Sequence, residues 1–205
     1  MKNKFIIIEG NIGAGKTSFV QKFCKLKNYK GVYEHFENNP FLPKFYEDPE
    51  KYAFTVEMSF LADRYHQLNK EIHQQDMFTD GIASDYYLVK SLIFARSTLS
   101  SQEFDLYRNI FNIIYQRLPS PDIYVYLHKS PEKLLSNIHE RGRDYEKNIS
   151  ADYLKSIENS YFTFFKQHPQ IPVLVINTED LDFVKSDDDF FKIVNQIEIK
   201  LKNEQ

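Results

Sequence analysis

A glycine-rich segment near the start of the chain constrains its fold more than any other feature. An apolar run at residues 5–8 leads into Gly10-Asn11-Ile12-Gly13-Ala14-Gly15-Lys16-Thr17, which matches the Walker A pattern G-x-x-x-x-G-K-[ST]. Its small residues allow backbone N–H groups to surround phosphate oxygens, the lysine adds positive charge, and the threonine offers a hydroxyl to Mg²⁺. The segment predicts a nucleotide-phosphate site between a strand and a helix that begins at Ser18.

The order of apolar patterns along the chain predicts the fold class. Runs typical of buried parallel strands lie at residues 5–8, 124–127 and 173–176, with weaker ones at 31–36 and 77–83. Helical patterns occupy residues 18–27, 50–74, 85–96, 103–118, 131–140, 152–167 and 187–202. We expect residues 40–43 to form a turn. This alternation predicts an α/β fold, a doubly wound five-stranded parallel sheet flanked by helices, with the active crevice at the carboxyl ends of the strands.

Length and composition limit the class of protein. The chain has 205 residues, 42% of them hydrophobic, which suits a single domain spanning residues 1–205. A net charge of −3 argues against a nucleic acid polymer as partner. The single cysteine, Cys24, predicts no intrachain disulfide and favours a cytoplasmic protein, and no apolar run is long enough to span a membrane. The six histidines lack the spacing of metal ligands.

Two further stretches carry candidate site residues. Glu34 lies near the end of the second predicted strand, where a carboxylate could take a proton from an attacking hydroxyl. Glu57, Phe60 and Arg64 share one face of a predicted helix, so they could project together. A stripe that faces the core and contains an internal salt bridge explains the same spacing equally well.

Arginines and a segment near the C-terminus suggest where a nucleotide is covered. Arg141-Gly142-Arg143 follows a predicted helix, and paired guanidinium groups beside a glycine suit a mobile lid over a triphosphate. A solvated charged loop is the other interpretation. Residues 177–183, which include Asp182 and Phe183, follow the last predicted strand and could fold against an adenine ring.

Together these stretches resemble the deoxynucleoside kinase family, particularly its bacterial deoxyadenosine and deoxyguanosine kinase branch. The resemblance covers nearly the whole chain and is carried by residues 39–54 (NPFLPKFYEDPEKYAF) and the Arg-Gly-Arg segment. It implies a P-loop kinase fold with a small lid at about residues 141–149, ATP as the donor, Mg²⁺, a small-molecule nucleoside substrate and a homodimer.

The resemblance also implies roles for individual residues. Glu34 matches the general base for the nucleoside 5′-hydroxyl, while Lys16 offsets charge on the phosphates. Tyr46 and Glu146 match residues that hold the sugar 3′-hydroxyl. Arg64 matches an arginine that helps to recognise the base, and Phe60 is a candidate for the apolar wall around it. Arg141 and Arg143 match lid residues that contact donor phosphates.

The chain departs from the family pattern at four positions. Asp85 stands where an arginine is expected, Lys90 where a base-reading aspartate is expected, Glu57 where a glutamine is usual and Asn137 where a further arginine is expected. We expect Glu57, Arg64 and Lys90 to form a rearranged polar cluster around the base. We also expect Thr17 and Asp85 to hold Mg²⁺, unless Asp80 is the family acid with slipped spacing.

The resulting functional expectation is ATP-dependent phosphorylation of the 5′-hydroxyl of a deoxyribonucleoside in nucleotide salvage. A purine is expected, with deoxyadenosine favoured. Because an ionised glutamate only accepts hydrogen bonds, Glu57 suits a base edge rich in donors. Two alternatives stay open from sequence alone, a nucleotide-binding pseudo-kinase that acts as a sensor and a nucleoside monophosphate kinase.

Overall fold

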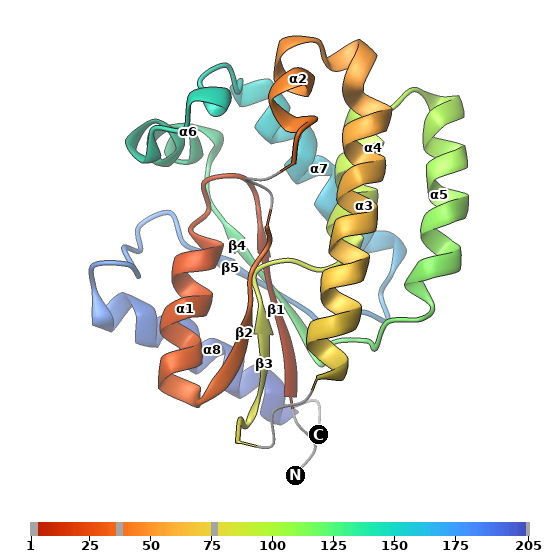
Figure 1. The fold of residues 1–205 in the computed structure, drawn as a ribbon. Helices are drawn as coiled ribbons and strands as arrows, with labels where there is room; N and C mark the ends of the chain where they lie inside the picture. The colour runs from red at the N-terminus through yellow and green to blue at the C-terminus, as the bar shows by residue number, and fades with distance from the viewer. Residues whose placement is uncertain (1–3, 36–38, 75–77, 204–205) are drawn as a thin grey trace.

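One parallel five-stranded sheet organises the chain (Figure 1). The computed structural model describes residues 4–35, 39–74 and 78–203. Its strands follow the order β2-β3-β1-β4-β5, with bounds β1 Lys4–Gly10, β2 Tyr29–Val32, β3 Gly81–Ser84, β4 Ile123–His128 and β5 Val173–Asn177. The central strand β1 pairs with β3 and β4, so that Ile7 lies between Ser84 and Tyr124. The predicted doubly wound α/β fold is confirmed.

Helices cover both faces of this sheet (Figure 1). Successive side chains of a strand point to opposite faces, and β1 supplies both cores. Ile6 and Ile8 pack with side chains of α1 (Lys16–Lys27) and α8 (Asp187–Asn203). Phe5 and Ile7 belong to the other core, which is shared with α3 (Pro49–His73), α4 (Val89–Thr98), α5 (Ser101–Tyr115) and α7 (Ala151–Gln167). The switch in winding leaves a crevice at the end of β1.

Three short elements lie above the carboxyl ends of the strands (Figure 1). They are α2 (Leu42–Glu47), α6 (Pro131–Arg141) and the 3₁₀ turn η1 (Asp144–Glu146). The prediction of a turn at residues 40–43 is wrong at its end, because Leu42 begins α2. Pro43 lies in the first turn of that helix, where its missing N–H has no helical partner to lose.

The expected helix at residues 85–96 begins four residues late, at Val89. Side-chain hydrogen bonds hold the preceding residues in a loop: Ser84 Oγ donates to the Tyr86 carbonyl oxygen at 2.6 Å, and the Tyr87 N–H donates to Glu9 Oε1 at 3.2 Å. The Ser84 bond is of the local kind that competes with helix formation, and the bond to Glu9 ties the loop to β1. The two weak strand predictions become the four-residue strands β2 and β3, and their ends at residues 36 and 77 lie outside the described residues.

Serine caps fix where the helices near the site begin. Ser100 accepts a hydrogen bond from the Glu103 N–H, and Glu103 reaches back to the Ser100 N–H, so α5 starts earlier than predicted. Ser130 caps α6 by accepting from the Lys133 N–H, and Ser150 caps α7 by accepting from the Tyr153 N–H. Within the described ranges, each helix is too short or too polar to cross a bilayer.

Candidate active site

The glycine-rich loop between β1 and α1 leaves no room for a side chain at Gly13 or Gly15. Gly13 and Gly15 have φ values of 82° and 85°, a conformation that glycine adopts without strain. A Cβ on Gly13 would lie 2.8 Å from the Leu134 carbonyl oxygen, and one on Gly15 would lie 2.9 Å from Cζ of Phe183. The loop therefore presents backbone N–H groups at the N-terminus of α1, as an anion site requires.

Lys16 lies across the mouth of this loop. Its Nζ donates hydrogen bonds to the carbonyl oxygens of Gly10 at 3.0 Å and Asn11 at 2.8 Å. Burial and the neighbouring Lys90 lower the pKa of Lys16 to about 8, although nearby carboxylates oppose that change. The ammonium group therefore stays charged near neutral pH and can exchange carbonyl oxygens for phosphate oxygens.

Glu34, just beyond β2, lies between two cations. Its Oε1 accepts from Nε and Nη2 of Arg64 at 2.7 and 2.6 Å, and its Oε2 accepts from Lys90 Nζ at 2.5 Å. Burial by itself would raise the pKa of Glu34, but Arg64 and Lys90 outweigh it and hold the pKa at about 2. Arg64 is fixed in turn, because its Nη1 donates to Ser91 Oγ at 2.8 Å. Glu34 is thus an ionised, oriented carboxylate.

Asp85 connects the phosphate loop to Glu34. Its Oδ2 accepts from the hydroxyl of Thr17, and its Oδ1 accepts from the Glu34 N–H at 2.8 Å. Burial raises the pKa of Asp85, and the hydrogen bond from Thr17 partly offsets this. Asp80, the other candidate for the family acid, is exposed before β3 and bonds with Asn28, so the structure brings Asp85 and not Asp80 to the loop.

Glu57 lies deeper in the crevice and has a different partner from the one expected. Its Oε1 accepts from Thr98 Oγ1 at 2.9 Å, while its Oε2 is buried without a hydrogen-bond partner among the described residues. Burial raises the pKa of Glu57 to about 7. Arg64 and Lys90 both bond to Glu34 instead. The structure therefore gathers Arg64 and Lys90 around Glu34, and the expected cluster of Glu57, Arg64 and Lys90 around the base stays a prediction.

The segment that the sequence predicts to be a lid begins where α6 ends. Gly142 takes a left-handed conformation with a φ of 72°, which terminates the helix between the two arginines. Arg141 Nη2 lies 2.5 Å from Glu146 Oε2, and Arg143 Nη1 lies 3.5 Å from Glu146 Oε1. Glu146 is only 5% exposed. One buried carboxylate therefore connects both arginines.

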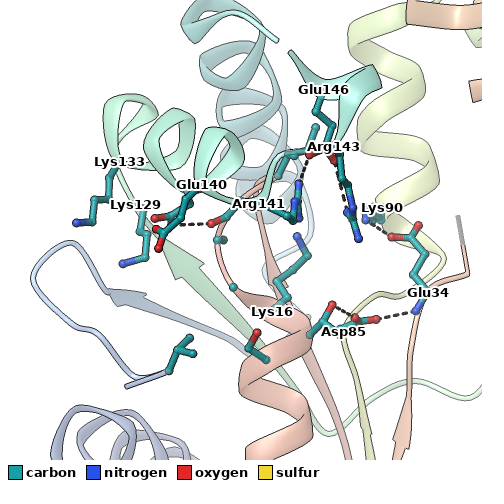
Figure 2. Close-up of a pocket in the computed structure, with 18 of the residues that line it drawn as sticks. Lys16, Glu34, Asp85, Lys90, Lys129, Lys133, Glu140, Arg141, Arg143 and Glu146 are labelled. Atoms are coloured by element: carbon teal, nitrogen blue, oxygen red, sulfur yellow. Dashed lines mark hydrogen bonds and ion pairs between the residues drawn. The ribbon is translucent and has the colours of Figure 1, made fainter. Parts of the chain in front are cut away.

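A single cavity of about 1110 Å³ joins these groups. Figure 2 shows Lys16 pointing toward Arg141 and Arg143, with Glu34 and Lys90 to one side. Residues 12–18 line one end, and the other end is lined by side chains that include Leu42, Phe45, Tyr46, Val56, Glu57, Phe60 and Phe94. Ligand pockets usually measure about 300–1,000 Å³. This cavity is therefore large enough for two ligands that meet near Glu34.

Comparison with known proteins agrees with this arrangement. The family model described as deoxynucleoside kinase matches residues 6–202. The chain belongs to the deoxynucleoside kinase family. The kinase is 34% identical over 197 residues to the deoxyguanosine kinase of Bacillus subtilis (strain 168), with 94% of this chain and 95% of the relative covered. It is 28% identical to the deoxyadenosine/deoxycytidine kinase of the same strain, over 96% of this chain and 92% of that relative.

Solved structures show the same likeness. The deoxyadenosine kinase from M. mycoides with bound dATP superposes with a TM-score of 0.80 at 26% identity, covering 95% of this chain and 99% of that one. The same enzyme with dCMP and dCDP bound gives a TM-score of 0.81. The family resemblance seen in the sequence is confirmed. The chain is an ATP-dependent deoxynucleoside kinase, which decides against the sensor and the monophosphate kinase that the sequence left open.

Most of the predicted site residues of the kinase line the cavity, with two exceptions. Gly10 and Asn11 do not line it. Asn11 is buried, and its Nδ2 donates to the Leu154 carbonyl oxygen at 2.7 Å, so its side chain anchors the loop to α7. Phe183 reaches the cavity but is only 3% exposed, and its ring packs 5.7 Å from that of Phe19. Asp182 is exposed beside it.

The sequence did not single out Lys129 or Thr98, and it gave no contact for Asn137. Lys129 directly follows β4 and donates to the carbonyl oxygens of Thr178 and Leu181, which fixes the loop at the donor end. Its place at the carboxyl end of a central strand was a usable signal. Asn137 donates to the Gly13 carbonyl oxygen at 2.8 Å and so joins α6 to the phosphate loop. Thr98 does not line the cavity but donates to Glu57, and it carried no sequence signal.

Proposed function

We propose that the kinase transfers the γ-phosphoryl group of ATP to the 5′-hydroxyl of purine deoxynucleosides. The observation that carries this proposal is the ionised Glu34 carboxylate, held by Arg64 and Lys90 in the same cavity as the phosphate loop. Relatives named as deoxyguanosine and deoxyadenosine kinases support a purine acceptor. The preference for deoxyadenosine that the sequence suggests stays a prediction.

Glu34 orients the acceptor hydroxyl in this proposal. An ionised carboxylate has about four lone-pair sites, and Arg64 and Lys90 together make three contacts with Glu34. The 5′-hydroxyl can donate to the site that remains. A carboxylate with a pKa of about 2 is a weak base. Because phosphoryl transfer has a loose transition state, placing the hydroxyl in line matters more than removing its proton early.

Positive groups on the opposite side of the cavity stabilise the charge on the transferring phosphoryl group. Lys16 and the N-terminus of α1 bind the donor phosphates on the side of the cavity formed by the glycine-rich loop. Arg141 and Arg143 face Lys16 across the cavity (Figure 2) and can exchange their contacts with Glu146 for phosphate oxygens. Tyr46 and Glu146, which both line the cavity, hold the sugar 3′-hydroxyl in this proposal.

The oxygen atoms beside the loop fit a magnesium ion. Mg²⁺ prefers oxygen ligands and is usually held by one or two protein groups together with substrate phosphates and water. Across the residues that the structure describes, no group of three or more His, Cys, Asp or Glu side chains gathers. The Thr17 hydroxyl would hold the ion directly and Asp85 through water. When bound, Mg²⁺ neutralises charge on the donor phosphates.

A panel of acceptors tests the proposed activity. We expect ADP release with deoxyadenosine or deoxyguanosine to exceed that with thymidine by at least about tenfold in kcat/KM, because tenfold corresponds to the loss of one good hydrogen bond to the base. A larger kcat/KM for thymidine would contradict the purine proposal.

The family resemblance also predicts a homodimer, and the single cysteine favours a cytoplasmic location. Light scattering of the purified protein would then give twice the 24.4 kDa mass of one chain. A mass of one chain at working concentration would contradict the dimer.

A further inference from the structure

The carboxyl group of Glu57 is a buried polar feature of the crevice that the mechanism above does not use. Glu57 is 4% exposed and lines the cavity, and its Oε2 has no hydrogen-bond partner within the described part of the chain. An unpartnered buried oxygen is costly unless a ligand satisfies it. The surrounding Phe60 and Phe94 side chains line the same part of the cavity, as a flat apolar ligand would need.

The groups that face Glu57 leave its carboxyl without a cation of its own. Five titratable side chains influence it: Arg64 of its own helix, Lys90 of α4, Glu34 beyond β2, Tyr107 of α5 and Tyr153 of α7. Arg64 and Lys90 are both bonded to Glu34. Burial therefore dominates, and the pKa of Glu57 is raised to about 7. The group changes charge in the pH range in which such an enzyme works.

The contact with Thr98 accommodates both charge states. The Thr98 hydroxyl lies 2.9 Å from Glu57 Oε1 and 3.0 Å from the Phe94 carbonyl oxygen, yet it has one proton to donate. If Glu57 is ionised, Thr98 donates to Oε1. If Glu57 carries a proton on Oε2, Thr98 still donates to Oε1, and the proton on Oε2 is available to a ligand. In both charge states Oε2 has no hydrogen-bond partner among the described residues.

We propose that Glu57 binds the Watson–Crick edge of the acceptor purine and that its protonation state selects the base. This inference rests on the proposed function. The carboxylate accepts from two donors, which matches N1–H and N2–H₂ of guanine. The carboxylic acid donates from Oε2 to N1 of adenine and accepts on Oε1 from N6–H₂, using the second lone pair of that oxygen. With the other base, each form sets two like groups against each other: the carboxylate sets an acceptor against N1 of adenine, and the acid sets its O–H donor against N1–H of guanine.

This selection has a quantitative signature. Deoxyguanosine uses the ionised enzyme and deoxyadenosine the protonated enzyme, so the ratio of their kcat/KM values follows the ratio of the two forms. That ratio changes tenfold per pH unit, whatever the pKa of Glu57. Ionisations that affect phosphoryl transfer itself act on both substrates and cancel. We therefore expect the deoxyguanosine-to-deoxyadenosine ratio to rise about a hundredfold between about pH 6.5 and about pH 8.5.

Glu57→Gln separates this proposal from other causes. A carboxamide keeps a donor and an acceptor but does not titrate, so the ratio should become independent of pH. Glu50→Gln is the matched control, since Glu50 lies on the same helix and is exposed, and it should retain the wild-type slope. A wild-type ratio that changes less than about threefold over this range would overturn the proposal, and so would a Glu57→Gln protein that keeps the wild-type slope.

Calorimetry on the wild-type protein gives a test that needs no variant. Titrations at about pH 7 in buffers of different ionisation enthalpy should show proton uptake with deoxyadenosine and proton release with deoxyguanosine. Equal proton exchange for the two nucleosides would overturn the inference. If the wild type phosphorylates both purine deoxynucleosides at a constant ratio, only the inference fails. If it phosphorylates neither at any pH, the proposed function fails as well.

Discussion

Replacing Glu34 by glutamine perturbs the most heavily charged point of the site. The change preserves the shape of the side chain but removes the negative charge between Arg64 and Lys90, whose side chains are 6% and 9% exposed. Glutamine has one carbonyl oxygen, and its NH₂ group cannot accept a hydrogen bond. At least one buried cation must therefore face a donor instead of a carboxylate.

Two independent arguments give the size of the effect. Removing one partner of a buried ion pair usually costs about 3–5 kcal/mol. Holding the pKa of Glu34 at about 2 instead of its ordinary 4.5 corresponds to about 3 kcal/mol of folding free energy. We therefore expect Glu34→Gln to lower the free energy of unfolding by about 3 kcal/mol and the melting temperature by about 6–12 °C. Turnover should fall at least about a hundredfold.

Urea unfolding near neutral pH measures this loss directly. Glu198→Gln is the control, because Glu198 pairs with Lys27 at the surface, where both side chains are about a third exposed, and should cost less than about 1 kcal/mol. Folding depresses the pKa of Glu34, so its contribution is complete above about pH 4.5 and is lost as the pH falls toward about 2. The difference between wild type and Glu34→Gln should shrink over that interval. A loss below about 1 kcal/mol at neutral pH would refute the reasoning.

Three other substitutions test the donor side. Gly13→Ala places a Cβ 2.8 Å from a carbonyl oxygen at a φ of 82°, so we expect a loss of about 1–3 kcal/mol in unfolding free energy and weaker ATP binding by calorimetry; unchanged ATP affinity would contradict the loop geometry. Asp85→Asn should raise the Mg²⁺ concentration needed for half-maximal rate severalfold, and an unchanged Mg²⁺ titration would remove Asp85 from the metal site. Lys16→Ala should lower kcat by about 10²–10³-fold in the ADP-release assay but shift the melting temperature little, because burial already disfavours its charge; near-normal kcat would count against its role.

The fold and the donor half of the site could be predicted because their signals are local. The glycine loop, the strand before it and the helix after it are contiguous, so pattern and structure coincide at residues 5–27. Thr17 and Asp85 follow adjacent strands of a parallel sheet and share a hydrogen bond, while their expected role in holding Mg²⁺ stays a prediction. Element boundaries failed where side chains bond to the backbone, as at the loop before Val89.

The acceptor half could be predicted only in part, because its contacts join distant segments. The cation partners of Glu34 lie 30 and 56 positions away in the sequence. Helical spacing alone could not show that Arg64 would form its ion pair with Glu34 rather than with Glu57. The two departures from the family pattern, Asp85 and Lys90, both contact Glu34 in the structure. Lys90 serves as a second counter-charge for Glu34, while Asp85 receives the Glu34 N–H and the Thr17 hydroxyl.

The central claim is that one cavity joins ATP on the glycine loop to a purine deoxynucleoside whose 5′-hydroxyl meets Glu34. Its most direct test is to identify the product formed from labelled ATP with deoxyadenosine or deoxyguanosine, and with the same nucleosides lacking the 5′-hydroxyl. We predict labelled 5′-monophosphate from the intact nucleosides and no labelled nucleotide from the 5′-deoxy analogues. Label transferred to another position, or transfer only to nucleoside monophosphates, would contradict the account.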